Sequence, residues 1–293
     1  MVKSFHKGVL CIVASAFGFA LMAMFVRLCD DYGAPVSSFQ KSFFRNVIAL
    51  VIALSVFVRR RSSGAAGSEP GILSDVGRAW PMLLLRATLG TVGIFANFYA
   101  LSHIPIAEGQ TLNKTAPFFT VLFAWLFLGE KANLRQALTL VTAFVGVLFI
   151  AKPGFAGEAA FPLAMGLLGG VCAGGAYACV RKLGLMRVDG ALIVLFFSVF
   201  SCLASVPFMA VRFDPMSVRQ VLTLMGAGAG AAIGQFGITA AYRFAAPRTI
   251  AVFDYTNILF TAAFGYLMFA QVPDGWSVLG FAVILLAAIR MRT

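Results

Sequence analysis

The chain has 293 residues, of which 60% are hydrophobic and only 12% are charged, with 23 Lys and Arg residues against 11 Asp and Glu residues. Soluble domains contain about 45–50% apolar and about 25% charged residues, so this chain has too few charges to cover a surface in contact with water. The composition excludes a soluble globular enzyme, a disordered chain and a small secreted domain held by disulfides. The apolar residues occur in long runs separated by short polar segments, which is typical of a protein embedded in a bilayer.

The net charge of +12 could indicate nucleic-acid binding, so the distribution of the basic residues matters. We find no basic face interleaved with aromatic residues and no nucleic-acid motif. The five cysteines form no C-x-x-C pair, and all but Cys29 lie well inside apolar runs, where a thiol behaves as a small hydrophobic group. We therefore expect no nucleic-acid partner, no bound metal and no disulfide framework.

A membrane-spanning helix needs about 20 mostly apolar residues. The first apolar run imitates a secretory signal but continues from Gly8 to about Leu28, beyond the roughly 7–15 residues of a signal core, so we interpret it as a spanning helix. The chain contains ten such segments, at residues 8–28, 38–58, 80–101, 106–128, 134–151, 162–180, 189–211, 219–242, 249–270 and 274–290.

The positions of the basic residues support this count, because cytoplasmic loops carry an excess of Lys and Arg. With ten spans and a cytoplasmic N-terminus, 15 of the 23 basic residues fall on the cytoplasmic side, 5 fall on the opposite side, and Arg45, Arg86 and Lys114 fall inside spans. A miscounted helix would remove this bias. We therefore predict ten transmembrane helices with both termini in the cytoplasm.

Ten helices can form two similar halves, and the sequence contains traces of such a repeat. A shift of 141 residues aligns five pairs of identical residues, Gly93 with Gly234, Ala100 with Ala241, Thr115 with Thr256, Phe119 with Phe260 and Thr120 with Thr261. Five helices per half would insert the halves with opposite orientations, and in transporters built this way the substrate site lies near the midplane between them. We expect the halves to be residues 1–151 and 152–293.

Several motifs of the first half resemble one known family. They are Ala100-Leu101-Ser102-His103-Ile104-Pro105-Ile106-Ala107, Thr115-Ala116-Pro117-Phe118-Phe119, Leu126-Phe127-Leu128-Gly129-Glu130, and Phe44-Arg45 with Ala49. The chain is similar in these motifs, and over nearly its whole length, to the ten-helix EamA-type transporters of the drug/metabolite transporter superfamily. In the second half Ala270-Gln271 replaces Gly-Glu, and the ninth helix has no proline that matches Pro117.

The resemblance implies an all-α integral membrane protein with ten transmembrane helices in two inverted five-helix repeats. It implies transport of small metabolites by alternating access. Similar branches of the family handle amino acids, S-adenosylmethionine, riboflavin and metallophores, and the motifs do not distinguish among these substrates.

Charged residues inside spans are candidates for the transport site, because each costs roughly 2.5–3.5 kcal/mol at mid-bilayer and normally faces a cavity or a partner. Arg45 fits either a structural pairing role or a ligand role. Arg86 could line the pathway or extend along the helix to the membrane interface. Lys114 lies deeper in its span than Glu108, and Pro117 could interrupt the helix beside it.

The second half supplies a matching polar group in the ninth helix. Under the 141-residue shift, Asp254 aligns with Asn113 and Tyr255 with Lys114, so the two groups are expected to meet between the halves. We predict a binding cavity lined by Asn113, Lys114, Asp254, Tyr255 and Asn257, with additional candidates Arg86, Asn97, Tyr99 and Gln235. Lys114 would bind a carboxylate and Asp254 an amine, which favours a zwitterion.

Glycines repeat every four residues in the sixth and eighth helices, at Gly166, Gly170 and Gly174 and at Gly226, Gly230 and Gly234. Each set predicts a smooth ridge on which another helix backbone packs closely. Tyr177 is a candidate for a gate or a cavity wall.

The sequence contains no nucleophile motif, no phosphate loop and no histidine cluster, so we expect no catalysis and no cofactor. Without an ATP site, transport would depend on gradients. Protons are a candidate coupling ion, with Asp254 or Glu108 as the carrier, because burial favours the neutral form of a carboxyl group.

We therefore predict a secondary active transporter of a small polar metabolite, an amino-acid-like zwitterion, in the bacterial cytoplasmic membrane. The alternative is transport of a larger organic cation or a nucleoside-like metabolite such as S-adenosylmethionine or a vitamin. A passive pore would need a continuous polar face, and a membrane enzyme would need catalytic pairs at the interface. The sequence favours neither, and it leaves the direction of transport and the oligomeric state open.

Overall fold

The structure is a computed structural model that describes residues 2–34, 36–62, 72–103, 112–151, 160–211, 213–270, 272 and 274–292. These residues form helices and short connections. The helices are α1 (Val2–Asp31), α2 (Ser38–Ser62), α3 (Ile72–His103), α5 (Ala116–Leu128), α6 (Leu134–Ala151), α7 (Ala160–Leu185), α8 (Gly190–Val211), α9 (Val218–Phe244), α10 (Pro247–Ile250), the 3-10 helix η1 (Ala251–Tyr255), α11 (Thr256–Phe269) and α12 (Gly275–Arg292).

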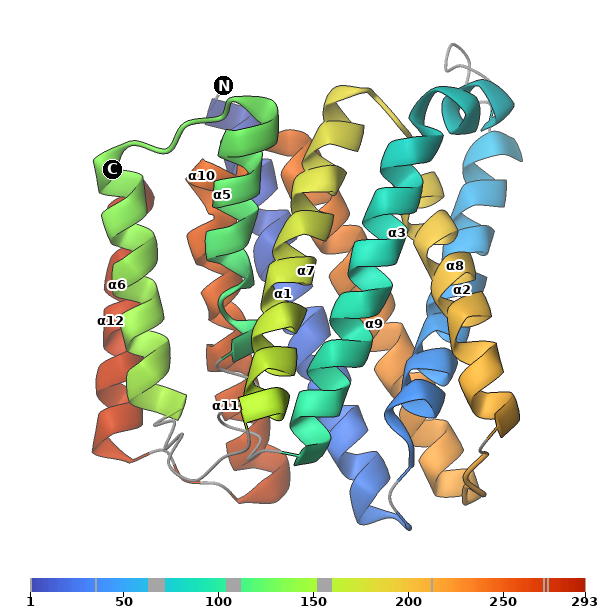
Figure 1. Cartoon of the computed structure of the whole chain (residues 1–293). Coiled ribbons are helices and arrows are strands. Elements are labelled where there is room, and N and C mark those ends of the chain that lie inside the picture. Colours follow the sequence, from blue (N-terminus) through green and yellow to red (C-terminus); the bar gives the residue numbers. More distant parts are fainter. Residues whose placement is uncertain are drawn as a thin grey trace.

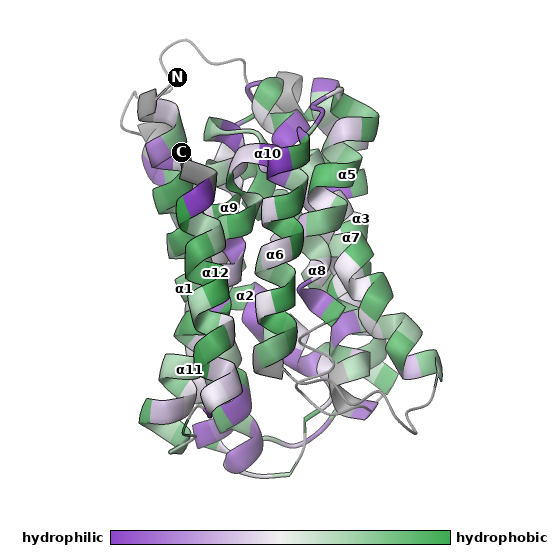
Figure 2. Ribbon diagram, turned by 90° about the vertical axis from the view of Figure 1, so that its left-hand side faces the viewer, coloured by the Kyte–Doolittle hydropathy of each residue, from purple (hydrophilic) through white to green (hydrophobic). Residues whose placement is uncertain are grey.

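Within the described ranges, seven segments are long and apolar enough to cross a membrane. Three shorter apolar helices accompany them, at Ala116–Leu128, Leu134–Phe149 and Gly275–Arg290. Together these ten segments fall at the ten predicted positions. Figure 2 shows hydrophobic residues along the length of the helices and hydrophilic residues gathered toward the two ends of the bundle.

The helices run up and down, so that the N-terminus of α1 and the C-terminus of α12 lie at the same end of the bundle (Figure 1). We call this end, which also holds the end of α5 and the beginning of α6, the terminal end, and the other the opposite end. The closest helix pairs are α1 with α9, α3 with α7, α6 with α12 and α2 with α8. Each of these four pairs joins a helix that ends by residue 151 to one that begins at residue 160 or later, so the two parts of the chain pack against each other throughout the bundle.

The repeated glycines explain how closely some helices approach. A Cβ atom added at Gly174 would lie 2.8 Å from the Thr120 nitrogen and 2.9 Å from the Ala116 oxygen of α5. One added at Gly230 would lie 2.9 Å from the Gly18 oxygen of α1. Both predicted ridges therefore pack directly on backbone, and these contacts confirm the predicted close approach for α7 and α9.

The predicted segment 249–270 is one apolar run in the sequence, but its helix is not uniform. It begins as α10, narrows to the 3-10 helix η1 at Ala251–Tyr255 and continues as α11. The predicted segment 106–128 is described from Leu112, and it contains a turn at Lys114 and Thr115 before α5 begins. Both irregular stretches lie between the ends of the bundle, where they position polar groups.

Candidate functional site

The two irregular stretches are held by matching hydrogen bonds. The Thr115 hydroxyl donates to the Leu112 carbonyl at 2.6 Å, and the Thr256 hydroxyl donates to the Phe253 carbonyl at 2.7 Å. Each threonine and each carbonyl is separated from its counterpart by 141 residues. A change of helix geometry frees backbone carbonyls, and a neighbouring hydroxyl can satisfy them inside a membrane. The second break therefore forms without a proline equivalent to Pro117.

One turn further along, the same correspondence holds. The Thr120 hydroxyl donates to the Ala116 carbonyl at 2.8 Å, and the Thr261 hydroxyl donates to the Asn257 carbonyl at 2.8 Å. These residues are again 141 positions apart. The threonine hydrogen bonds of the segments that carry Lys114 and Asp254 thus recur at corresponding positions in both parts of the chain.

Lys114 and Asp254 lie at these two breaks, within electrostatic range of each other. Both side chains are half-buried. Within the described part of the chain they form no direct ion pair with each other. Of the predicted site, this is the pair that best fits the expected recognition of a carboxylate and an amine.

Arg86 lies at the centre of α3 with only 1% of its surface exposed. Its Nη2 donates to Gln235 Oε1 at 2.8 Å, and its guanidinium carbon lies 3.8 Å from the centroid of the Phe197 ring. Its Nε and Nη1 atoms have no hydrogen-bond partner among the residues that the structure describes. Arg86 therefore does not extend to the membrane interface, and the structure brings two of the predicted site residues, Arg86 and Gln235, into direct contact.

Tyr177 of α7 is close in charge interactions both to Asp254 and to the buried arginines. It is within electrostatic range of Asp254, Arg86 and Arg45, and its ring packs 5.9 Å from that of Tyr242. The sequence marks Tyr177 only as a candidate wall or gate, because nothing in its local pattern shows that charged residues of three other helices are within electrostatic range.

Other predicted residues have structural roles. Asn257 donates from Nδ2 to the Ala16 carbonyl of α1 at 2.8 Å and is 7% exposed, so it joins α11 to α1. Tyr255 is fully buried, and its hydroxyl has no hydrogen-bond partner among the described residues.

The remaining candidates are spread more widely. Asn97 packs against Gly169 of α7, and its Oδ1 is buried without a partner. Tyr99 stacks on His103 near the end of α3 with ring centroids 4.1 Å apart, about 20 Å along the helix axis from Arg86. Asn113 is half-buried beside Lys114, and Glu108 lies outside the described residues.

The terminal end contains an ion pair that the sequence does not indicate. Arg181 of α7 donates from Nε and Nη2 to Glu130 Oε1, at 2.8 and 2.7 Å, and from Nη1 to the Tyr242 carbonyl at 3.2 Å. The two charged side chains are only 13% and 14% exposed. Glu130 belongs to the Gly-Glu motif at the end of α5, but the motif alone does not reveal its partner. The pair ties α5, α7 and α9 together on one side of the charged residues.

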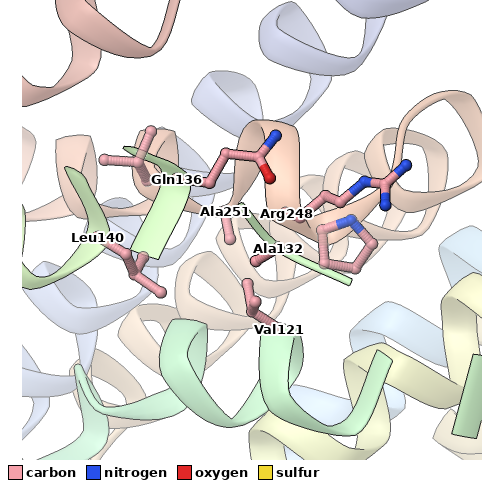
Figure 3. Close-up of a pocket in the computed structure, with 8 residues that line it drawn as sticks. Val121, Ala132, Gln136, Leu140, Arg248 and Ala251 are labelled. Atoms are coloured by element: carbon pink, nitrogen blue, oxygen red, sulfur yellow. The ribbon is translucent and has the colours of Figure 1, made fainter. Parts of the chain in front are cut away.

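A small pocket lies at the junction of α5, α6, α10 and η1, where Val121, Gln136, Arg248 and Ala251 meet (Figure 3). Its volume of about 10 Å³ holds one water molecule. Lys114 and Asp254 do not line it, and a space of this size is too small for a metabolite.

Long apolar helices around buried charges define a multi-pass integral membrane protein. Residues 6–152 match the EamA-like transporter family, and the chain belongs to this family. The resemblance to the drug/metabolite transporter superfamily is therefore confirmed.

Known relatives are transporters. The chain is 31% identical to the pseudopaline exporter CntI of Pseudomonas aeruginosa over 97% of this chain and 95% of the relative. It is 28% identical to the riboflavin transporter of Brucella anthropi over 80% of each chain. One crystal structure shares the fold with a TM-score of 0.78 and 18% identity, over 95% of this chain and 96% of that chain. Family and relatives thus indicate a transporter.

Proposed function

We propose that this protein is a secondary active transporter that moves a small polar metabolite, an amino-acid-like zwitterion, by alternating access. The observation that carries the proposal is the placement of Lys114 and Asp254 at two helix breaks, with opposite charges in electrostatic range and no direct ion pair among the described residues. A ligand with a carboxylate and an amine can bind between them.

The proposed architecture is ten transmembrane helices in two inverted repeats, residues 1–151 and 152–293. Helix packing supports it. If α1 corresponds to α7 and α3 to α9, the α1–α9 pair corresponds to the α7–α3 pair, and both are extensive. The α5–α7 contact likewise corresponds to that of α11 with α1. The hydrogen bonds that repeat after 141 residues support the same correspondence.

We place both termini in the cytoplasm of a bacterial cell, with the protein in the cytoplasmic membrane. The excess of Lys and Arg in loops of the terminal end supports this orientation. In that orientation Glu130 and Arg181 close the cytoplasmic side of the charged residues. Alternating access would then require this ion pair to break and re-form in each cycle.

A second candidate substrate class is a larger heterocyclic or nucleoside-like metabolite, such as a vitamin. The similarity to a riboflavin transporter supports it. The exporter named among the relatives supports outward movement, whereas the charged residues are compatible with either direction.

Flux of labelled metabolites into proteoliposomes tests the proposal. Zwitterionic amino acids, a nucleoside and riboflavin are compared in vesicles with wild-type protein, Lys114→Ala or Asp254→Asn. We expect saturable uptake of one class by the wild type and loss of at least 90% of the rate in both variants. Unchanged uptake in both variants would exclude this site, and equal, non-saturable flux of all solutes would indicate a pore.

A further inference from the structure

We infer that the central site binds a substrate with at least two carboxylates, or comparable oxyanions, one held by Lys114 and another by the guanidinium groups of Arg45 and Arg86. This inference rests on the proposed transport function and specifies its substrate class as an acidic, multiply charged compound. It follows from two buried arginines whose charges the described chain does not balance.

Both arginines are buried inside the helix bundle. Arg86 is 1% exposed and Arg45 is 4% exposed, on helices α3 and α2. Both lie well inside apolar segments, Arg86 near the middle of α3 and Arg45 two turns into α2. A charged group in such a place is costly unless an opposite charge or a set of hydrogen bonds compensates it.

Both arginines have buried nitrogen atoms without a hydrogen-bond partner among the described residues. Among the described residues, Nε and Nη1 of Arg86 have no hydrogen-bond partner, and neither has Nε of Arg45. Neither arginine forms an ion pair with any carboxylate in the described part of the chain. Their like charges also repel each other. Buried donors without partners are rare in folded proteins and often belong to binding sites.

Two contacts hold the Arg86 side chain in one orientation. Gln235 accepts a hydrogen bond from Arg86 Nη2, and the Phe197 ring lies against the guanidinium plane. These contacts fix the side chain but occupy only one of its five N–H groups. A guanidinium held in this way presents its free edge to a carboxylate, which it can bind with two parallel hydrogen bonds.

The charged residues of the central site have an excess of positive charge. Away from the two ends of the bundle, the charged residues that the structure describes are Arg45, Arg86, Lys114 and Asp254. Tyr177 is within electrostatic range of both arginines and of Asp254, and Asp254 is within electrostatic range of Lys114. The four charged residues are therefore linked by electrostatic interactions. Three positive charges and one negative charge are complementary to a ligand with up to three carboxylates and one amine.

A series of probes with increasing negative charge tests the inference on the purified full-length protein. Alanine has one carboxylate, aspartate has two, and N-(carboxymethyl)aspartate has three, each with one amine, while lysine has the opposite net charge. Binding is measured by ligand-induced thermal stabilisation and transport by uptake into proteoliposomes. We expect the wild type to prefer the probes in the order of their carboxylates, with roughly tenfold between neighbours.

Matched variants locate the preference. Arg45→Gln and Arg86→Gln should each weaken binding of the two acidic probes about tenfold and leave alanine nearly unchanged, while Arg86→Lys should retain part of the preference. Arg187→Gln, which removes an exposed arginine at the terminal end, should behave as the wild type. The ligand-free Arg45→Gln protein should be at least as stable as the wild type, because the substitution removes an unpaired buried charge.

Several results would overturn the inference. They are equal affinity for alanine and the acidic probes, preference for lysine, absence of binding of all three acids, an unchanged preference in both arginine variants, or a marked loss of stability in ligand-free Arg45→Gln. Saturable transport of alanine or lysine without a preference for acids would leave the proposed function intact. Absence of saturable transport of every solute, in this series and in the wider panel, would reject both.

Discussion

Glu130 and Arg181 form an ion pair at the terminal end of the bundle, in which Nε and Nη2 of Arg181 both donate to one carboxylate oxygen, Oε1 of Glu130. Because Glu130 follows α5 and Arg181 lies on α7, the pair joins the two proposed repeats. A third bond, from Arg181 to the Tyr242 carbonyl, adds α9. This arrangement closes the bundle beside the charged residues, and it gives a direct way to test whether the terminal end opens during transport.

Glu130→Gln should open the terminal end more often, because it weakens a charge-assisted pair worth about 1.5–3 kcal/mol. Cys179 lies two residues before Arg181 and is 7% exposed, so its alkylation by N-ethylmaleimide reports the opening. With the other four cysteines replaced by alanine, the alkylation rate should rise about tenfold or more. The reversed pair, Glu130→Arg with Arg181→Glu, should restore part of the protection. An equal rate in wild type and Glu130→Gln would show that the pair is not a gate.

Ala270→Gly should stabilise the protein. Ala270 ends α11 in the left-handed conformation with φ of 52°, as Gly129 ends α5 with φ of 69°. An alanine in this region costs about 1–2 kcal/mol relative to its preferred conformation, whereas glycine adopts it freely. Gly129→Ala should therefore destabilise by a similar amount. Unfolding midpoints in mixed detergent micelles check both, and shifts in the same direction for both variants would contradict the explanation.

Gly174→Ala should destabilise the contact between α7 and α5 by about 1–3 kcal/mol, because the new methyl group would meet the backbone of α5. Gly77→Ala is the matched control. Gly77 lies on an exposed part of α3 where an added Cβ meets nothing within 4 Å, so the same substitution should raise helix stability by about 0.5–1 kcal/mol. Equal thermal stabilities of the two variants would show that the ridge is not tightly packed.

Much of the fold is predictable from the sequence because spanning a bilayer requires long apolar segments, and the ten predicted segments coincide with apolar helices. The change from α10 to η1 and α11 was not predicted, since hydropathy is insensitive to helix type. What marks the break is local chemistry, a threonine hydroxyl at Thr256 that bonds the Phe253 carbonyl. The same residue type at Thr115 marks the first break, so the repeat in hydroxyls is more informative there than Pro117.

The site is predictable only in part. Lys114 and Asp254 follow from charge and repeat position, and the structure places them within electrostatic range of each other. Asn257 and Tyr99 were expected in the site, but a polar residue in an apolar helix can equally bond a neighbouring helix, as Asn257 does with Ala16. The proximity of Arg45, Arg86 and Tyr177 depends on how three helices pack, which no spacing within one segment reveals.

Asp254→Asn should uncouple transport from a proton gradient if Asp254 carries the coupling proton. The variant should then fail to concentrate substrate when an imposed pH gradient drives the wild type, and the slow exchange that remains at raised substrate concentration should not respond to pH. Glu108→Gln is the companion variant. If collapse of the pH gradient leaves wild-type accumulation unchanged, proton coupling is wrong for both residues.

The central claim is that Lys114 and Asp254 contact the substrate. Equilibrium binding of the transported compound to purified wild type, Lys114→Ala and Asp254→Asn tests it most directly, with Lys131→Ala, an exposed lysine at the terminal end, as the control. We expect about tenfold or greater loss of affinity in the two site variants, with an unchanged unfolding midpoint, and wild-type affinity in the control. Wild-type affinity in both site variants would contradict the claim.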